Sequence, residues 1–91
     1  MIAWPPKDPD DVLDYSIDFS AILEADGDTL SAISWTFPIG LTKDSQAEAS
    51  GVALVWISGG TDGVRYQIGC RATTTGGRTY DRTAELTVRE A

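Results

Sequence analysis

Alternating hydrophobic and polar residues in the C-terminal third of the chain predict a long β-hairpin. From Val64 to Thr73 every second residue is apolar, a period typical of a strand with one buried face. Gly76-Gly77 follows, and glycine closes tight turns because it adopts positive φ without a steric penalty. A return strand runs from Thr83 to Arg89 with the same alternation. The predicted inward residues are Val64, Tyr66, Ile68, Cys70, Ala72, Ala84, Leu86 and Val88.

The rest of the chain also favours strands over helices. Residues 14–23 and 30–37 each alternate, with predicted inward positions at Tyr15, Ile17, Phe19, Ala21, Ile33, Trp35 and Phe37. Between them, Asp26-Gly27 is typical of a turn, whereas the polar residues 42–51 indicate either a connecting loop or a poorly formed edge strand. No window longer than about 10 residues carries a helical stripe, so we predict an all-β protein.

The segment Val52–Ile57 is apolar on both faces of the predicted strand. We expect Val55 and Ile57 to point into the core, which leaves Leu54 and Trp56 on the other face. An apolar patch of this kind is typical of a contact between subunits. The alternative is that the N-terminal segment folds back and covers Trp56.

The first twelve residues predict an extended arm, followed by one sandwich domain over residues 13–91. Pro5, Pro6 and Pro9 fix φ, remove backbone donors and bias the preceding residues toward extended geometry. The arm lies along the edge of the sandwich or reaches a neighbouring molecule, with Trp4 as its large apolar anchor.

Two aromatic positions indicate an immunoglobulin-like sandwich. The run Asp62-x-Val64-x-Tyr66-x-Ile68 resembles the tyrosine corner of such folds, in which a Tyr hydroxyl bonds nearby backbone. The alternative is an ordinary inward-facing Tyr66. Trp35 occupies the place of the central buried Trp, near Cys70 and Ile68. We therefore predict an antiparallel immunoglobulin-like β-sandwich of about seven strands.

The net charge of −7 disfavours a nucleic-acid partner, because phosphate contacts require a basic surface. Residues 1–62 hold eleven acids and two lysines, whereas residues 63–91 hold five arginines and three acids. Copies of the chain can therefore attract one another through unlike halves. The alternative is that the hairpin simply carries solvated arginines.

The residues that most enzymes need are scarce. The chain has no histidine, and Cys70, its one cysteine, falls on a predicted inward position. The acid clusters of residues 8–14 and 26–28 lack the later ligands of a calcium loop. We predict no catalytic site, metal or cofactor. The chain also has no 18-residue apolar run and no signal-peptide pattern, so we expect a protein that meets no membrane and stays in the cytoplasm or enters a particle.

Four short segments together resemble small tailed-bacteriophage virion proteins of the fiber-tail adaptor or head–tail neck type. They are Lys-Asp-Pro-Asp-Asp-Val-Leu-Asp-Tyr at residues 7–15, Ser-Trp-Thr at 34–36, Val-Trp-Ile-Ser-Gly-Gly-Thr at 55–61 and Thr-Gly-Gly-Arg-Thr-Tyr-Asp-Arg at 75–82. The resemblance implies a non-enzymatic immunoglobulin-like subunit of a phage or prophage particle, near the head–tail junction. The implied partners are copies of the chain in a ring and other virion head–tail or tail proteins.

For such an assembly we expect hydrophobic contacts from Trp4, Leu54 and Trp56. We expect Arg65, Arg71, Arg78 and Arg82 to meet acidic groups of a neighbour. The alternative function is an immunoglobulin-like ligand- or carbohydrate-binding module of a bacterial surface protein, in which the three tryptophans stack on sugar rings.

Overall fold

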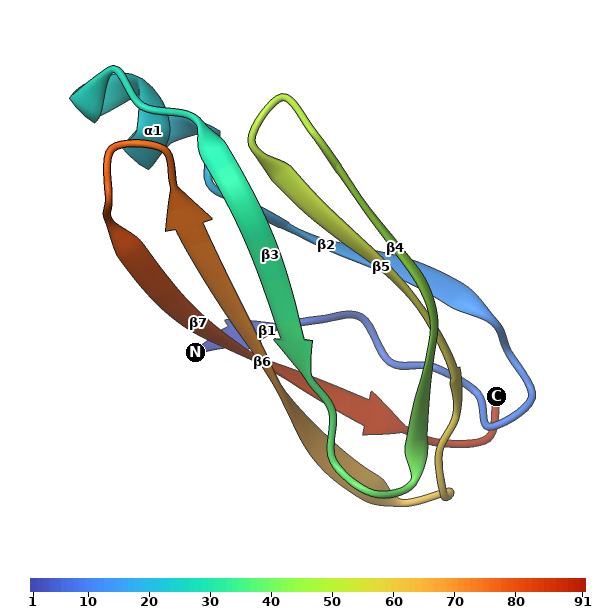
Figure 1. Ribbon diagram of the computed structural model, residues 1–91. Helices are drawn as coiled ribbons and strands as arrows, with labels where there is room; N and C mark the ends of the chain where they lie inside the picture. Colours follow the sequence, from blue (N-terminus) through green and yellow to red (C-terminus); the bar gives the residue numbers. More distant parts are fainter.

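The computed structural model describes residues 1–91 as two β-sheets packed face to face with one short helix (Figure 1). The first sheet has the strand order β1-β7-β6-β3, and the second has the order β2-β5-β4. The elements are β1 (Ile2–Ala3), β2 (Leu13–Asp18), α1 (Ser20–Asp26), β3 (Leu30–Thr36), β4 (Leu41–Ala49), β5 (Val52–Gly59), β6 (Val64–Thr74) and β7 (Thr79–Val88).

This strand order confirms the predicted immunoglobulin-like sandwich. Strands β3, β6 and β7 correspond to the C, F and G strands of that fold, and β2, β5 and β4 to its B, E and D strands. The tyrosine corner is present, because the Thr61 N–H donates a hydrogen bond of 2.9 Å to the Tyr66 hydroxyl. Gly40 (φ 107°) packs against the same ring, where a Cβ atom would lie 3.1 Å from the hydroxyl oxygen.

The hairpin of β6 and β7 is confirmed, with Ile68 opposite Ala84 and Tyr66 opposite Leu86. All the predicted inward residues of the two strands are buried except Val64. Val64, the first residue of β6, is exposed, although Val88 opposite it is fully buried.

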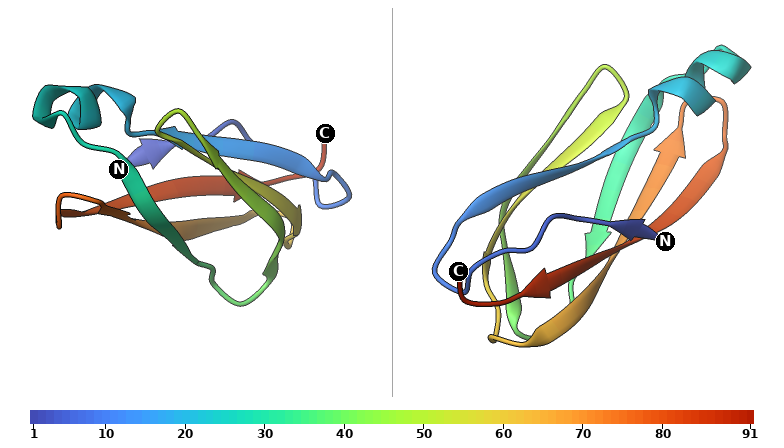
Figure 2. Two further views of the ribbon diagram at one scale, coloured as in Figure 1. Left: turned by 45° about the horizontal axis from the view of Figure 1, so that its top comes forward. Right: turned by 180° about the vertical axis from the view of Figure 1, so that it is seen from behind.

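The N-terminal arm lies along the edge of its own sandwich (Figure 2). Strand β1 pairs in parallel with β7, and Lys7 continues this contact by donating its N–H to the Thr87 carbonyl. The Trp4 ring stacks on Tyr15 with 4.8 Å between ring centroids. Of the two predicted courses for the arm, the structure therefore shows the one along the edge.

The prediction of a strand over residues 14–23 is wrong beyond Asp18, where helix α1 begins. The Asp18 carboxylate accepts a hydrogen bond from the Ser20 N–H at the start of the helix. At the other end, Gly27 is left-handed (φ 62°), and the N–H groups of Gly27 and Asp28 donate to the Glu24 and Leu23 carbonyls. This is a Schellman cap, so Asp26-Gly27 ends a helix and does not close a hairpin.

Two further segments refine the prediction. Residues 41–49 form β4, an edge strand with a bulge between Lys43 and Ser45. The edge-strand alternative is therefore confirmed, but the strand is paired along its length and not poorly formed. Trp35 is opposite Cys70 as expected, but it is only partly buried. The expectation of a fully buried central Trp is wrong, because β3 is an edge strand of its sheet.

Candidate protein interface

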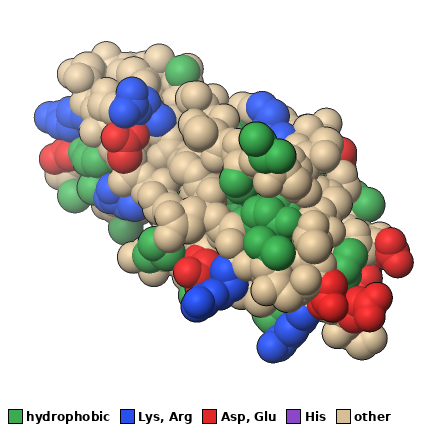
Figure 3. Space-filling view, turned by 90° about the horizontal axis from the view of Figure 1, so that it is seen from below, with side chains coloured by type: hydrophobic (Ala, Val, Ile, Leu, Met, Phe, Trp, Pro, Cys, Tyr) green, Lys and Arg blue, Asp and Glu red, His purple; other side chains and the backbone are tan.

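Exposed hydrophobic side chains are found at few places on the surface. In the space-filling view from below, a group of such side chains lies right of the middle of the face, and the largest group of acidic side chains lies at the right end (Figure 3). The large hydrophobic residues with the greatest exposure are Met1, Val12, Ile39, Trp56 and Val64. Of these, Trp56 lies in the middle of strand β5, and Val64 is the first residue of β6.

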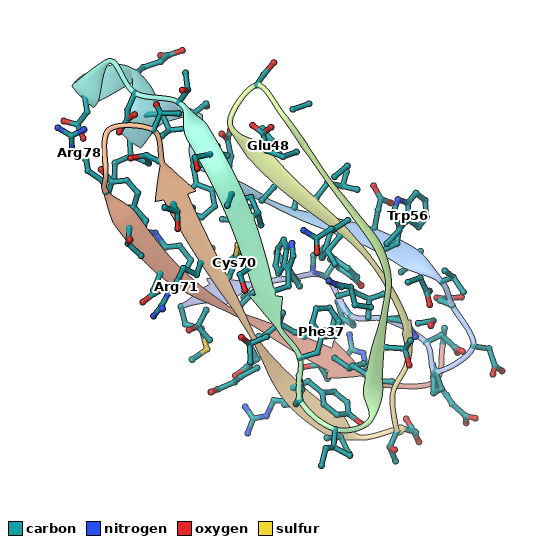
Figure 4. All side chains as sticks on the ribbon, viewed as in Figure 1. Phe37, Glu48, Trp56, Cys70, Arg71 and Arg78 are labelled. Carbon is teal, nitrogen blue, oxygen red and sulfur yellow. The ribbon has the colours of Figure 1, made fainter.

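Strand β5 presents an apolar stripe on the outer face of its sheet, formed by Val52, Leu54 and Trp56. The intervening residues of the strand point inward and are fully buried, as predicted for Val55 and Ile57. Trp56 is 41% exposed and points away from the sandwich (Figure 4). We call Val52, Leu54 and Trp56 the β5 stripe.

The strands beside β5 leave the β5 stripe accessible. On β4, the residues opposite the stripe are Ser45, Ala47 and Ala49, and on β2 they are Asp14, Ser16 and Asp18. Residues directly opposite each other share one face of a sheet, so these short side chains flank the stripe without covering it. The N-terminal arm follows β7 instead, and the alternative in which it covers Trp56 is wrong.

Three of the four arginines predicted to meet a neighbour already have partners within the chain. Arg71 binds both carboxylate oxygens of Asp81, at 2.8 and 3.1 Å. The Arg78 guanidinium lies 2.9 Å from the Asp28 carboxylate, and the Arg82 guanidinium lies over the Phe19 ring. Arg71 and Arg78 project from the hairpin in Figure 4. Arg65 is exposed and forms no ion pair in the chain, which leaves it free for a partner.

Asp28 joins the end of helix α1 to the tip of the β6–β7 hairpin. Its side chain is 4% exposed, and it accepts hydrogen bonds from the N–H groups of Thr29 and Gly76 and from Arg78. The Thr74 hydroxyl, these N–H groups and the guanidinium hold the pKa of the Asp28 carboxyl well below its usual range, against the opposing effect of burial. The Asp28 carboxylate therefore has a structural role: it holds the end of helix α1 against the hairpin.

Replacement of Asp28 by Asn is expected to lower the free energy of unfolding at neutral pH. The variant is also expected to lose less stability than the wild type when the pH is lowered. Because the folded state depresses the pKa of Asp28, its stabilisation is present above the unfolded value of about 3.9 and disappears as the pH falls below it. Urea unfolding of both proteins between neutral pH and pH 3 measures the difference. Asp10→Asn, which removes an exposed carboxylate without a side-chain hydrogen bond, is the control. Equal losses in acid for wild type and Asp28→Asn would contradict the assignment.

Two other residues singled out in the sequence lie in the interior. Trp4 is buried in the core, and its indole N–H donates to the Ser16 carbonyl at 3.3 Å, so it is not presented on the surface of the protomer. Burial raises the pKa of the Cys70 thiol to about 11, which disfavours the thiolate needed by a nucleophile. The structure holds no group of three or more potential metal ligands.

Comparison with known proteins places this sandwich in a phage family. The family model described as "Podophage GP4 fiber-tail adaptor protein gp77" matches residues 7–87. The chain belongs to this family. The match covers nearly the whole sandwich and confirms the predicted resemblance to fiber-tail adaptors. No curated protein sequence matches the chain.

Membership of the family indicates a structural phage-tail protein and thus a component of the virion. No helix of this chain is long and apolar enough to cross a membrane. The exposed part of the β5 stripe was predictable from the sequence, but Ile39, which is fully exposed in the β3–β4 loop, was not among the predicted interface residues. An apolar residue between Pro38 and Gly40 was the available signal, because turn centres are usually polar.

Proposed function

We propose that the adaptor is a non-enzymatic structural subunit that assembles as a ring at the head–tail junction or in the tail, where it binds other tail proteins. The single observation that carries this proposal is the exposed β5 stripe on the outer face of the β2-β5-β4 sheet. Family membership supplies the setting in the phage tail.

The β5 stripe has the composition of an interface centre. Aromatic side chains, tryptophan above all, contribute most of the binding energy in many protein interfaces. Burial of apolar surface contributes about 25 cal/mol per Å², so covering the half-exposed Trp56 and Leu54 favours association. A ring needs a contact between two different surfaces of each copy, repeated around an axis.

The carbohydrate-binding alternative receives no support from the positions of the tryptophans. Trp4 is buried, Trp35 is partly buried against the core, and only Trp56 is substantially exposed. A platform of several tryptophans for sugar rings is therefore not formed.

A Trp56→Glu variant is expected to abolish self-association without unfolding the protein. The new carboxylate faces solvent in the monomer, but it would lie without a partner in a contact that buries Trp56. Light scattering over a concentration series measures the mass of wild type and variant. Thr83→Glu adds the same charge at an exposed position of the other sheet and is expected to retain the wild-type mass. A wild-type protein that stays monomeric at high concentration and is absent from purified particles would overturn the proposed function.

A further inference from the structure

The turn Pro38–Gly40 carries an apolar residue that the protomer does not use. The connection between β3 and β4 lies at the lower end of the molecule in Figure 1. Ile39, in this connection, is fully exposed. The turn is held in place, because the Leu41 N–H bonds the Pro38 carbonyl and Gly40 packs on the Tyr66 ring. An isolated exposed isoleucine is common, but one at the tip of a fixed turn is well placed to enter a partner.

An arginine without an acidic partner in the chain lies on strand β6 beside this turn. Strands β3 and β6 pair in antiparallel fashion up to Thr36 and Gly69, and continuing the register brings the turn beside Tyr66. Arg65 precedes Tyr66 and points to the outer face, where it has no acidic partner in the chain. The apolar tip of the turn and the positive charge of Arg65 therefore lie at the same end of the molecule, with Arg65 on the outer face of its sheet.

The β5 stripe presents the complementary pair of features. Asp14 lies directly opposite Trp56 on the outer face of the sheet, and it too forms no ion pair within the chain. Asp18 lies opposite Val52 on the same face. The stripe is therefore an apolar surface bordered by negative charge on its β2 side.

We infer that the Pro38–Gly40 turn of one copy docks on the β5 stripe of the next, with Arg65 of the first copy facing Asp14 of the second. This inference rests on the proposed ring and names the two surfaces that form it. The turn and Arg65 belong to one part of the protomer and the stripe to another, so the contact repeats from copy to copy.

Charge argues against the symmetric alternative, in which two stripes meet face to face. Where β2 of one copy lies over β2 of the other, that contact brings Asp14 and Asp18 of both copies together, and like charges at an interface are unfavourable. Docking of the turn replaces this repulsion by an attraction between Arg65 and Asp14.

Charge reversal on each side tests the pairing. Asp14→Arg alone and Arg65→Asp alone are each expected to raise the concentration needed for association by at least about 10-fold, since each creates a like-charge contact. An equimolar mixture of the two variants is expected to associate again, because each unlike pair is then restored. The doubly substituted chain is expected to associate like wild type, which also shows that the substitutions do not unfold it.

Disulfide cross-linking identifies the surfaces directly. Ile39→Cys reports on the turn, and Ala47→Cys reports on the stripe, because Ala47 is exposed opposite Leu54. A mixture of the two variants is expected to give the mixed cross-linked dimer under mild oxidation. The wild-type chain, whose Cys70 is buried, is the control without cross-links.

The outcomes separate this inference from the proposed function. Association of the wild type without rescue in the mixture, or cross-linking of Ala47→Cys to itself, would overturn the docking of the turn and leave a ring with other surfaces. A wild-type protein that is monomeric and absent from particles would instead contradict the proposed ring itself. Rescue together with the mixed cross-link supports the inference.

Discussion

Replacement of Leu86 by alanine is expected to lower the free energy of unfolding by about 2–5 kcal/mol. Leu86 is fully buried between the sheets, opposite Tyr66, so the substitution leaves a cavity in the centre of the core. A domain of 91 residues has a total stability of only about 5–15 kcal/mol, so the loss is a large part of it. Urea unfolding followed by tryptophan fluorescence measures the change.

The matched control is Leu54→Ala, which removes the same atoms from the outer face of β5. Leu54 is only partly buried, so we expect a loss of about 1 kcal/mol or less. The same variant is expected to weaken self-association, because Leu54 belongs to the β5 stripe. Equal destabilisation by the two substitutions would show that the outer face is as tightly packed as the core, which would contradict the assignment of the stripe to an interface.

The β6–β7 hairpin was predictable because all the information for it is local. Alternation over ten residues fixes which face is buried, and Gly77 supplies the positive φ of the turn. The tyrosine corner was predictable for a similar reason, since Tyr66 and its backbone partner Thr61 are only five residues apart.

Helix α1 was missed because its first residues continue the alternation of β2. Phe19 and Leu23 are both buried and lie four residues apart, which is the spacing of one helix face. The run of Ile22, Leu23, Glu24 and Ala25 before Gly27 was the available helix signal. A seven-residue helix is too short to show a clear period, so the turn interpretation of Asp26-Gly27 prevailed.

The candidate site was predictable only in part, because pairing of charged side chains depends on the tertiary fold. Leu54 and Trp56 followed from the double apolar face of one strand. Arg78 and Asp28 are fifty residues apart in the chain and meet only when the hairpin tip packs beside the helix. Sequence alone therefore does not distinguish this paired arginine from Arg65.

Replacement of Lys7 by methionine is expected to cost about 1–3 kcal/mol of stability and to loosen the N-terminal arm. Lys7 is 1% exposed, and its ammonium group donates to the carbonyls of Asp8, Pro9 and Gly59 at 2.8, 3.4 and 2.6 Å. Methionine fills a similar volume but donates nothing, so these carbonyls lose their charged donor. The relief of ammonium desolvation offsets only part of this loss.

The contact between Lys7 and Gly59 ties the arm to the end of β5, so the effect should be local as well as global. Amide hydrogen exchange at Arg89, whose N–H donates to the Lys7 carbonyl, is expected to accelerate in Lys7→Met. Lys43→Met is the control, since Lys43 is exposed and bonds only Gln46, and its expected change is within about 0.5 kcal/mol. If both variants had the same stability and the same exchange at Arg89, the Lys7 side chain would contribute nothing to holding the arm. The difference between the two lysines therefore measures what a buried cation without an acidic partner contributes to the position of the arm.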